Sequence, residues 1–462
     1  MTTENIYFIG AGGIGMAALE RYFLSKGCNV AGYDRTPSAL TDALAKEGVA
    51  ITFGGEADEI PASHRDPSTT TVVYTPAVPA ELPIFEWFRA NGFNPVKRAA
   101  VLGAVTRTSR GLCFAGTHGK TTTSSMAAHL LHSSSHGCNA FLGGVLRNYG
   151  TNFLLDPESD LSVIEADEYD RSFHHLTPEV AVVTSTDPDH LDIYGTEEAY
   201  LESFAHFTEL IQPGGFLVVH TGLKLVPRVH ESVRVYTFGR EEGDFHAANV
   251  RCGDGRIVFD FVYPGGTVAD IELGVPVAIN VDNAVASLAA VWLTGTLTPG
   301  LARRAMASYP GVERRFEFHL KEDGPCGRAV IDDYAHHPDE LRQSIASVRA
   351  LYPGRRLTVA FQPHLYSRTR DFAPQFAEAL DTADEVVLID LYPAREEPIP
   401  GISSKTIFDK LNCPHKSMIS KENFVDTMKN SNFEILLTAG AGDLNLYVPQ
   451  LVRALRTPDG CN

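Results

Sequence analysis

A glycine-rich stretch followed by a lysine and three threonines carries the clearest chemistry in this sequence. It reads AGTHGKTTTSS over 115–125, between an apolar run and a run of helical character. A glycine turn between a strand and a helix directs unpaired backbone N–H groups toward a ligand at the positive end of the helix dipole. A lysine there reaches terminal phosphates, and a threonine hydroxyl binds Mg²⁺. The stretch therefore predicts a nucleoside triphosphate site, with a glycine turn and a surface lysine as the alternative. The residues assigned to it are Gly116, Thr117, His118, Gly119, Lys120, Thr121 and Thr122.

A second glycine-rich turn follows the apolar run Asn5–Ile9, close to the start of the chain. It has the pattern G-x-G-x-x-G, and an acidic residue comes about 20 positions later, at the end of a second predicted strand. This spacing is typical of dinucleotide sites, but the same geometry binds any diphosphate, because it supplies only N–H groups and a helix N-terminus. A purely structural turn is the alternative. A threonine at the end of the strand that begins at Thr71 could contact the same ligand or cap its own loop. The candidate ligand residues are Gly10, Gly12, Gly13, Ile14, Gly15, Asp34 and Thr75.

Two buried strands are predicted over 161–164 and 180–184, and each ends in a polar cluster. The first cluster begins at Glu165 and the second contains His190. Ligands of open α/β sheets bind at the carboxyl ends of strands. A carboxylate and an imidazole there, beside Thr121, would suit Mg²⁺ ions that bridge phosphates. Alternatively, Glu165 caps a helix and His190 is a hydrogen-bonded loop histidine.

Asn280 and Asn283 lie three residues apart, where a helix over 284–293 is expected to begin. They could bind the adenine edge and a phosphate of a nucleotide, but their position alone favours capping of the helix. Upstream, 213–275 is rich in predicted strands and turns and has no motif, so we expect it to be scaffold. Downstream, strands over 329–331, 356–361, 385–389 and 434–438 alternate with helices, which predicts a further doubly wound parallel sheet. The expected fold class is therefore α/β.

Length and composition limit the class of protein. A chain of 462 residues suggests about three domains. Its net charge of −18 argues against a general nucleic-acid or anionic-membrane surface. The seven cysteines are scattered without a C-x-x-C pair, as is typical of reduced thiols in the cytosol. No apolar run approaches the roughly 18 residues of a membrane helix. We expect a cytoplasmic protein that binds no nucleic acid and does not insert into membranes.

Taken together and in order, the motifs resemble those of the Mur ligase family. They are AGTHGKTTT, IEADEYDRSF, DPDHLD, INVDN, GVERRF, DDYAHHP, FQPHLYSRTR and TAGAGD, and they extend over essentially the whole chain. The resemblance implies a Rossmann-like UDP-sugar domain over 1–105, a central P-loop domain for ATP and magnesium over 106–310, and a Rossmann-like amino-acid domain over 311–462. It implies an ATP-dependent ligase that joins L-alanine to UDP-N-acetylmuramate through an acyl phosphate, in the synthesis of peptidoglycan precursors. The alternative within the family is the branch that attaches an intact tripeptide to the same sugar nucleotide.

The resemblance also implies roles for individual residues. Lys120 would contact the β- and γ-phosphates of ATP. Thr121 and Glu165 would hold one Mg²⁺ and His190 a second, with Mn²⁺ as a substitute. The two asparagines would hold ATP, and Arg315 and Asp333 would complete its site, with Arg314 as the alternative to its neighbour.

The last domain would surround L-alanine or the muramyl carboxylate with Tyr334, His336, His364 and Arg368. One position departs from the family pattern, because many relatives have arginine where this chain has Leu365. Carboxylate recognition could therefore shift to Arg368 or Arg370. The oligomeric state stays open, as does the group that deprotonates the amine. Two classes outside the family are a nicotinamide dehydrogenase, which the first glycine turn alone would suggest, and a non-catalytic nucleotide switch.

Overall fold

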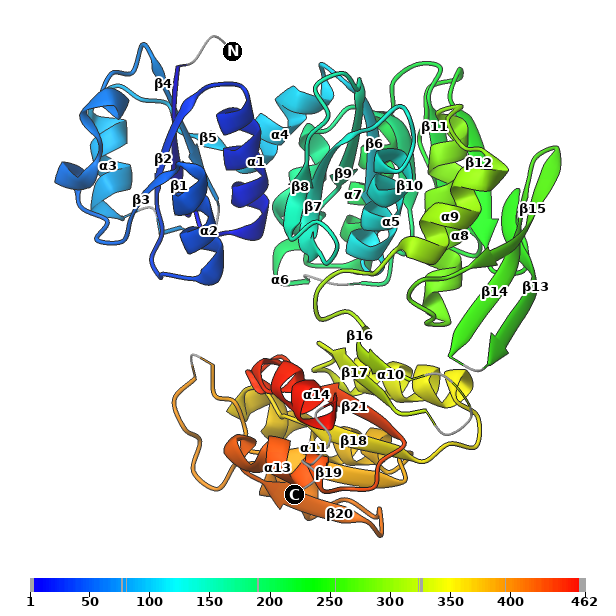
Figure 1. Cartoon of the computed structure of the whole chain (residues 1–462). Helices are drawn as coiled ribbons and strands as arrows, with labels where there is room; N and C mark the ends of the chain where they lie inside the picture. Colours follow the sequence, from blue (N-terminus) through cyan, green and yellow to red (C-terminus); the bar gives the residue numbers. More distant parts are fainter. Residues whose placement is uncertain are drawn as a thin grey trace. The chain divides into compact units, whose positions relative to one another are not determined.

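The computed structural model describes residues 4–75, 78–79, 81–188, 191–253, 255–322, 324, 327–394 and 396–456. The chain folds into two compact units. Met1–Ala248, Asp260–Ile271 and Val281–Pro310 form the first, and Asn249–Phe259, Glu272–Asn280 and Gly311–Asn462 form the second. Three β-sheets, with strands labelled in Figure 1, organise these units.

The first sheet has five parallel strands in the order β3-β2-β1-β4-β5. β1 (Asn5–Ile9) is buried along its whole length, as its apolar sequence requires. β2 pairs on one side of β1 and β4 on the other, so the strand order reverses here. Such a switch point is where open α/β sheets bind ligands. The glycine turn after β1 lies at this point. The remaining elements are α1 (Ile14–Ser25), β2 (Asn29–Tyr33), α2 (Ala39–Glu47), β3 (Ala50–Thr52), β4 (Thr70–Tyr74), α3 (Pro83–Ala90), β5 (Val96–Lys97) and α4 (Arg98–Thr106).

The second sheet has ten strands in the order β15-β14-β13-β12-β11-β10-β6-β9-β7-β8. β6 (Arg110–Ala115) lies between β9 (Leu161–Glu165) and β10 (Pro178–Val183), and it pairs parallel with both. The residues that follow these three strands therefore meet at one edge of the sheet. The other elements are α5 (Lys120–His132), β7 (Asn139–Leu146), β8 (Thr151–Leu154), α6 (Leu191–Tyr194), α7 (Glu197–Glu209), β11 (Phe216–His220), β12 (Arg234–Gly239), β13 (Phe245–Gly253), β14 (Arg256–Tyr263), β15 (Gly266–Glu272), α8 (Ile279–Leu293) and α9 (Pro299–Ser308).

Helix α1 packs on the second sheet as well as on the first. Its Tyr22 ring lies 5.6 Å from the ring of Phe141 on β7. One apolar core contains buried residues from both sheets and from α1, among them Phe8 of β1, Leu19 of α1 and Ile164 of β9. The glycine turn before α1 is thereby held at a fixed position relative to the end of β9.

The third sheet lies in the second unit and has six strands in the order β16-β17-β21-β18-β19-β20. β16 runs antiparallel to β17, and the other pairs are parallel. Its elements are β16 (Glu317–Lys321), β17 (Ala329–Asp333), α10 (Pro338–Leu351), β18 (Leu357–Phe361), α11 (Tyr366–Leu380), β19 (Glu385–Ile389), α12 (Lys405–Phe408), β20 (Lys416–Ile419), α13 (Phe424–Lys429), β21 (Ile435–Ala439) and α14 (Val448–Arg456).

The predicted α/β class with three sheets is confirmed. The four strands expected in the last third correspond to β17, β18, β19 and β21, and the β-rich stretch 213–275 supplies β11 to β15. The structure adds β3, β5, β7, β8, β16 and β20, which we did not predict. The domain boundaries after 105 and 310 stay a prediction. In the described part of the chain, no helix combines the length and the apolar character needed to cross a membrane.

Candidate functional site

The glycine loop after β6 leads directly into α5, as the sequence predicted. Gly116 has φ +143° and Gly119, which precedes the helix, has φ +83°. A Cβ atom at Gly116 would lie 2.1 Å from Thr184 Oγ1, so this position has no space for a side chain. Among the described residues, no side chain caps the N-terminus of α5. The first N–H groups of a helix have no acceptor within the helix, so these groups can bind an anion.

Lys120 begins α5, and its ammonium group folds back over the loop. Nζ donates to Gly116 O at 2.6 Å, to Thr117 O at 3.4 Å and to Glu168 Oε1 at 2.8 Å. The lysine side chain is 15% exposed and that of Glu168 only 2%. Burial raises the pKa of the Glu168 carboxyl, and the charge of Lys120 opposes this shift. Lys120, which we predicted to bind phosphate, is therefore held in the described structure by a nearly buried ion pair with Glu168.

Thr121 and Glu165, the two predicted ligands of one Mg²⁺, touch each other. Thr121 Oγ1 donates to Glu165 Oε1 at 3.0 Å, and the N–H of Gly143 donates to Oε2 at 2.9 Å. Burial raises the pKa of Glu165, although these two hydrogen bonds and Lys120 favour its ionised form. Oxygen donors of this kind, together with phosphate and water, suit Mg²⁺. Among the described residues, no three His, Cys, Asp or Glu side chains gather around one point as a metal site would require.

The loop after β10 lies against the glycine loop. Ser185 Oγ accepts from the N–H of His118 at 2.8 Å, and Thr117 Oγ1 donates to Asp187 O at 2.7 Å. Ser185 and Asp187 are thus anchored beside the phosphate loop. His190, the predicted ligand of a second Mg²⁺, lies outside the described residues. Thr122 lies in the first turn of α5, where its carbonyl accepts from Ser125 Oγ at 2.9 Å.

Asn280 and Asn283 contact different parts of the chain. Asn283 is buried, and its Oδ1 accepts from Thr123 Oγ1 of α5 at 3.1 Å. A Cβ at Gly119 would lie 2.8 Å from this oxygen, so Asn283 lies directly beneath the phosphate loop. In the second unit, Asn280 Nδ2 donates to Val275 O at 3.1 Å. Since α8 begins at Ile279, neither asparagine is the residue that precedes the helix.

The glycine turn after β1 satisfies most of its own N–H groups. Gly10 and Ala11 donate to Tyr33 O at 2.8 and 2.9 Å, and Gly12 donates to Asp34 Oδ2 at 2.6 Å. Gly13 donates to Gly10 O at 3.2 Å. In the part of the chain that the structure describes, no side chain caps α1. An anion bound here would therefore contact the first turn of α1, from Ile14, and Asp34 maintains the shape of the turn.

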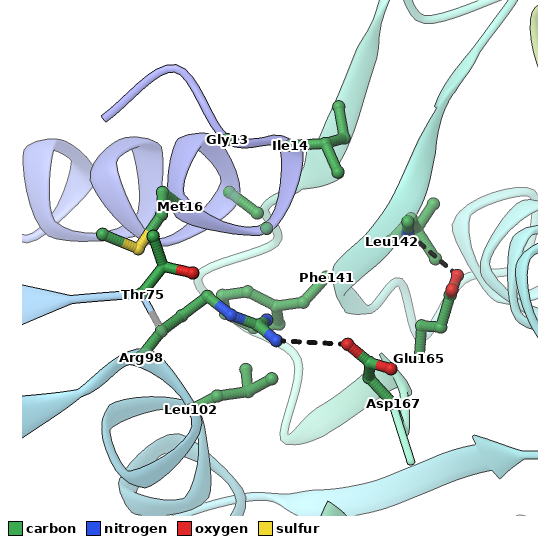
Figure 2. Close-up of a pocket in the computed structure, with 13 residues that line it drawn as sticks. Gly13, Ile14, Met16, Thr75, Arg98, Leu102, Phe141, Leu142, Glu165 and Asp167 are labelled. Atoms are coloured by element: carbon green, nitrogen blue, oxygen red, sulfur yellow. Dashed lines mark hydrogen bonds and ion pairs between the residues drawn. The ribbon is translucent and has the colours of Figure 1, made fainter. Parts of the chain in front are cut away.

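A pocket of about 340 Å³ extends from this turn to the end of β9. Figure 2 shows Thr75 and Met16 on the side of the first sheet and Glu165 and Asp167 on the other. Between them, the guanidinium of Arg98 from α4 lies 3.6 Å from Asp167 Oδ2. The pocket brings the predicted diphosphate turn together with the predicted metal ligand. Its lining residues are Gly13, Ile14, Gly15, Met16, Ala18, Thr75, Arg98, Leu102, Phe141, Leu142, Gly143, Glu165 and Asp167.

In the second unit, the two candidate arginines have different surroundings. Arg314 donates to Gly440 O at 2.8 Å and to Gly442 O at 3.2 Å, and its guanidinium lies 4.6 Å from the centre of the Tyr334 ring. Arg315 is exposed, and its charge favours the ionised form of Asp333. Asp333 accepts from Ser344 Oγ and from the N–H of Phe316. The guanidinium of Arg314 thus donates hydrogen bonds within the second unit.

The four residues predicted to surround the amino acid lie together at the carboxyl ends of β17 and β18. The His336 ring lies 5.1 Å from that of Tyr334 and 6.1 Å from that of His364. His364 Nδ1 and Arg368 Nη1 are buried, and neither has a hydrogen-bond partner among the described residues. Burial lowers the pKa of His364, and the charge of Arg368 adds to this effect. The unsatisfied guanidinium N–H of Arg368 at this strand end favours an acidic ligand, and the His364 ring nitrogen beside it can donate or accept according to its tautomer.

Leu365, which departs from the family pattern, has an unusual backbone conformation. Its φ is +71° and its ψ +136°, a backbone conformation that residues other than glycine rarely adopt. Its N–H donates to Tyr392 O at 3.0 Å. Backbone strain next to His364 is consistent with a functional site.

Comparisons with known proteins agree with this arrangement. Three family models match successive segments: "Mur ligase family, catalytic domain" at 5–110, "Mur ligase middle domain" at 114–291, and "Mur ligase, glutamate ligase domain" at 314–450. The chain belongs to the Mur ligase family. Relatives named UDP-N-acetylmuramate–L-alanine ligase include a Phocaeicola vulgatus protein, 57% identical over 97% of this chain and 98% of its own. A Porphyromonas gingivalis protein of that name is 50% identical over 98% and 99%.

Solved structures similar to this chain include members of both branches considered above. The UDP-N-acetylmuramate–alanine ligase of Thermotoga maritima is 26% identical, covers 97% of this chain and 98% of its own, and has a TM-score of 0.79. A murein peptide ligase from Psychrobacter arcticus is 20% identical, covers 99% and 100%, and has a TM-score of 0.62, which shows the fold alone. The comparisons favour the L-alanine branch over the peptide branch.

Sequence reasoning did not assign roles to several residues of the site. Arg98 was assigned to no motif, and Asp167 and Glu168 were included only in the polar cluster that begins at Glu165. Spacing could not separate them, because their partners Arg98 and Lys120 are 69 and 48 positions away. Only the pairing of β6 with β9 brings Glu168 to the phosphate loop.

Proposed function

We propose that this chain joins L-alanine to the lactyl carboxylate of UDP-N-acetylmuramate at the expense of ATP. The carboxylate attacks the γ-phosphoryl group, which gives an acyl phosphate and ADP. The amine of L-alanine then displaces phosphate and forms the amide. The relatives that extend over nearly the whole chain bear the name of this reaction. The pocket that joins the first turn of α1 to Glu165 is the observation on which the proposal rests.

The pocket suits a sugar nucleotide whose reactive end must reach the phosphate loop. Its diphosphate would lie on the first turn of α1, near Gly13, Ile14 and Gly15, with Thr75 beside it. A Cβ at Gly15 would lie 2.8 Å from Arg98 Nη1, so a guanidinium is available next to this turn. The far end of the pocket is Glu165, which touches Thr121 of the phosphate loop. A carboxylate placed there would be close to the phosphoryl group that it attacks.

The phosphate loop would hold ATP, with Lys120 on the β- and γ-phosphates and Asn283 supporting the loop from beneath. Thr121 and Glu165 would hold one magnesium ion, or manganese in its place, and His190 a second. When bound, such ions offset the charge on phosphate oxygens as two anions approach each other. Arg315 and Asp333 would complete the ATP site. Arg314 is the weaker candidate, since its guanidinium binds the carbonyls of Gly440 and Gly442.

The third sheet would bring the amino acid. His364 and Arg368 would bind a carboxylate with the buried donors that have no partner among the described residues. Tyr334 and His336 lie beside them and would orient the amine. Because an acyl phosphate hydrolyses easily, the reaction requires a site from which water is excluded.

Phosphate release measured with each substrate omitted in turn tests the proposal. We expect release only when ATP, UDP-N-acetylmuramate and L-alanine are all present, with formation of one amide for each phosphate. A panel of other amino acids and of the intact tripeptide tests the choice of amine. Release without the sugar nucleotide, or a preference for the tripeptide, would contradict the assignment.

A further inference from the structure

Glu168 is a buried carboxylate to which the proposed reaction assigns no role. Its side chain is 2% exposed, and one oxygen receives Lys120 Nζ at 2.8 Å. The other oxygen, Oε2, is buried and has no hydrogen-bond partner among the described residues. Burying a charge is costly unless it is well paired. Among the described side chains, the ammonium of Lys120 is the one partner of this carboxylate, beside the backbone N–H of Glu168 itself.

All three N–H donors of the Lys120 ammonium have acceptors. An ammonium group has three donors, and the three acceptors here are the carbonyls of Gly116 and Thr117 and the Glu168 carboxylate. To contact a phosphate, Lys120 must give up or share one of these bonds. The carboxylate is the acceptor that competes most directly with phosphate, because both are anions that form charge-assisted hydrogen bonds with the same cation.

The backbone that carries Glu168 is tied down on both sides, so the carboxylate cannot follow the lysine. Tyr194 OH donates to the carbonyl of Glu168 at 2.5 Å. Asp167 lies 3.6 Å from Arg98, and Asp170 pairs with Lys97 at 2.8 Å. When the ammonium moves toward a phosphate, the ion pair with Glu168 must lengthen or break.

We propose that Glu168 is a positioning residue that holds Lys120 in the empty phosphate loop and competes with the nucleotide for it. The inference rests on the proposed ATP site. The ion pair keeps the loop ordered without ligand, and it lowers nucleotide affinity because part of the binding energy is used to release the lysine. Glu168→Gln keeps the shape of the side chain and removes its charge, so the competitor is weakened while the loop stays intact.

Isothermal titration of ADP with Mg²⁺ into the full-length chain tests this proposal. We expect Glu168→Gln to bind ADP roughly tenfold more tightly than the unchanged chain, which corresponds to about 1.4 kcal/mol and lies near the low end for a hydrogen bond to a charged group. Glu168→Asp keeps the charge but shortens the side chain by one methylene, so its ADP affinity should lie between that of Glu168→Gln and that of the unchanged chain. If Glu168→Gln does not fold, as judged by thermal melting, Glu168→Met removes the same competitor and should show the same gain.

Two further variants separate this explanation from a general effect of charge. Glu197→Gln removes one charge from the same unit, but its partner is the exposed Lys224, so ADP affinity should change less than about twofold. In a Lys120→Met background no ammonium is left to release, and Glu168→Gln should then give no comparable gain. Equal or weaker ADP binding by Glu168→Gln, or a gain that persists without Lys120, would overturn the inference. If the unchanged chain bound no ADP, the proposed ATP site would itself be wrong, and the inference with it.

Discussion

Replacing Lys120 by alanine should abolish ligation and leave binding of the sugar nucleotide intact. Lys120 does not line the pocket that extends from the first turn of α1 to Glu165. Its ammonium lies in the phosphate loop, where it would meet the charge that develops on the transferring phosphoryl group. Loss of a single preorganised donor to such a charge costs about 10²- to 10³-fold in kcat. A full positive charge is removed here, so we expect a loss at or above the upper value.

Lys120→Ala should also lower the free energy of unfolding. It leaves the Glu168 carboxylate, 2% exposed, without the lysine that pairs with it at 2.8 Å. Breaking a buried ion pair by removing one partner typically costs about 3–5 kcal/mol. The double variant Lys120→Ala/Glu168→Gln removes both charges and should recover most of that loss. It should not recover ligation, because the ammonium is still absent.

Phosphate release and titration calorimetry with UDP-N-acetylmuramate measure the two effects separately. Lys224→Ala is a matched control in the same unit. Its ammonium pairs with Glu197 at 2.6 Å and is 76% exposed, so the variant should behave like the unchanged chain. If Lys120→Ala lost affinity for the sugar nucleotide as completely as it lost ligation, while the chain stayed folded, the division between the two ligand sites would be wrong.

Three further changes test other parts of the structure. Glu165→Gln removes a negatively charged oxygen ligand beside Thr121, so the Mg²⁺ concentration required for half-maximal activity should rise. Loss of a group that only supports a metal ligand typically costs about 10- to 100-fold, and we expect a rise at least as large. Arg368→Ala removes a buried donor at the proposed carboxylate site and should raise the KM for L-alanine by about tenfold or more, with the KM for ATP unchanged; an equal effect on both would argue against this assignment. Burial raises the pKa of Glu20 well above its ordinary value, so the folded chain holds a proton that the unfolded chain releases, and the stability this contributes is lost as the pH rises through the raised pKa. Glu20→Gln should therefore flatten the decline in melting temperature as the pH rises above the usual pKa of a glutamate, and an unchanged slope would argue against this role of Glu20.

The sequence predicted those parts of the fold that follow from local pattern. The glycine loops, the buried strands that precede them and the polar residues at strand ends lie where periodicity and turn chemistry placed them, as with β6 and the loop from Gly116 to Gly119. The antiparallel pair β7 and β8 was missed, because short strands with glycine and polar residues carry a weak period-two signal.

Contacts between distant segments could not be predicted in the same way. The motif that contains Glu165 identified a metal ligand, but nothing in its spacing indicated that Glu168, three positions on, would reach Lys120. Similarly, the place of Asn283 near the expected start of a helix predicted a capping role. Its side chain instead supports α5 across a separation of 160 positions. Such pairings depend on strand order and helix packing, which a single sequence does not determine.

The first glycine turn shows why a fingerprint of this kind does not identify its ligand. In dinucleotide enzymes the acidic residue after the second strand binds a ribose hydroxyl. In this chain Asp34 accepts the N–H groups of Gly12 and Thr36, so its carboxylate serves the turn itself. What distinguishes the ligand is the other end of the pocket, where Glu165 touches a threonine of the phosphate loop. A hydride carrier has no need of a phosphate loop there, whereas a sugar nucleotide whose carboxylate must be phosphorylated requires one.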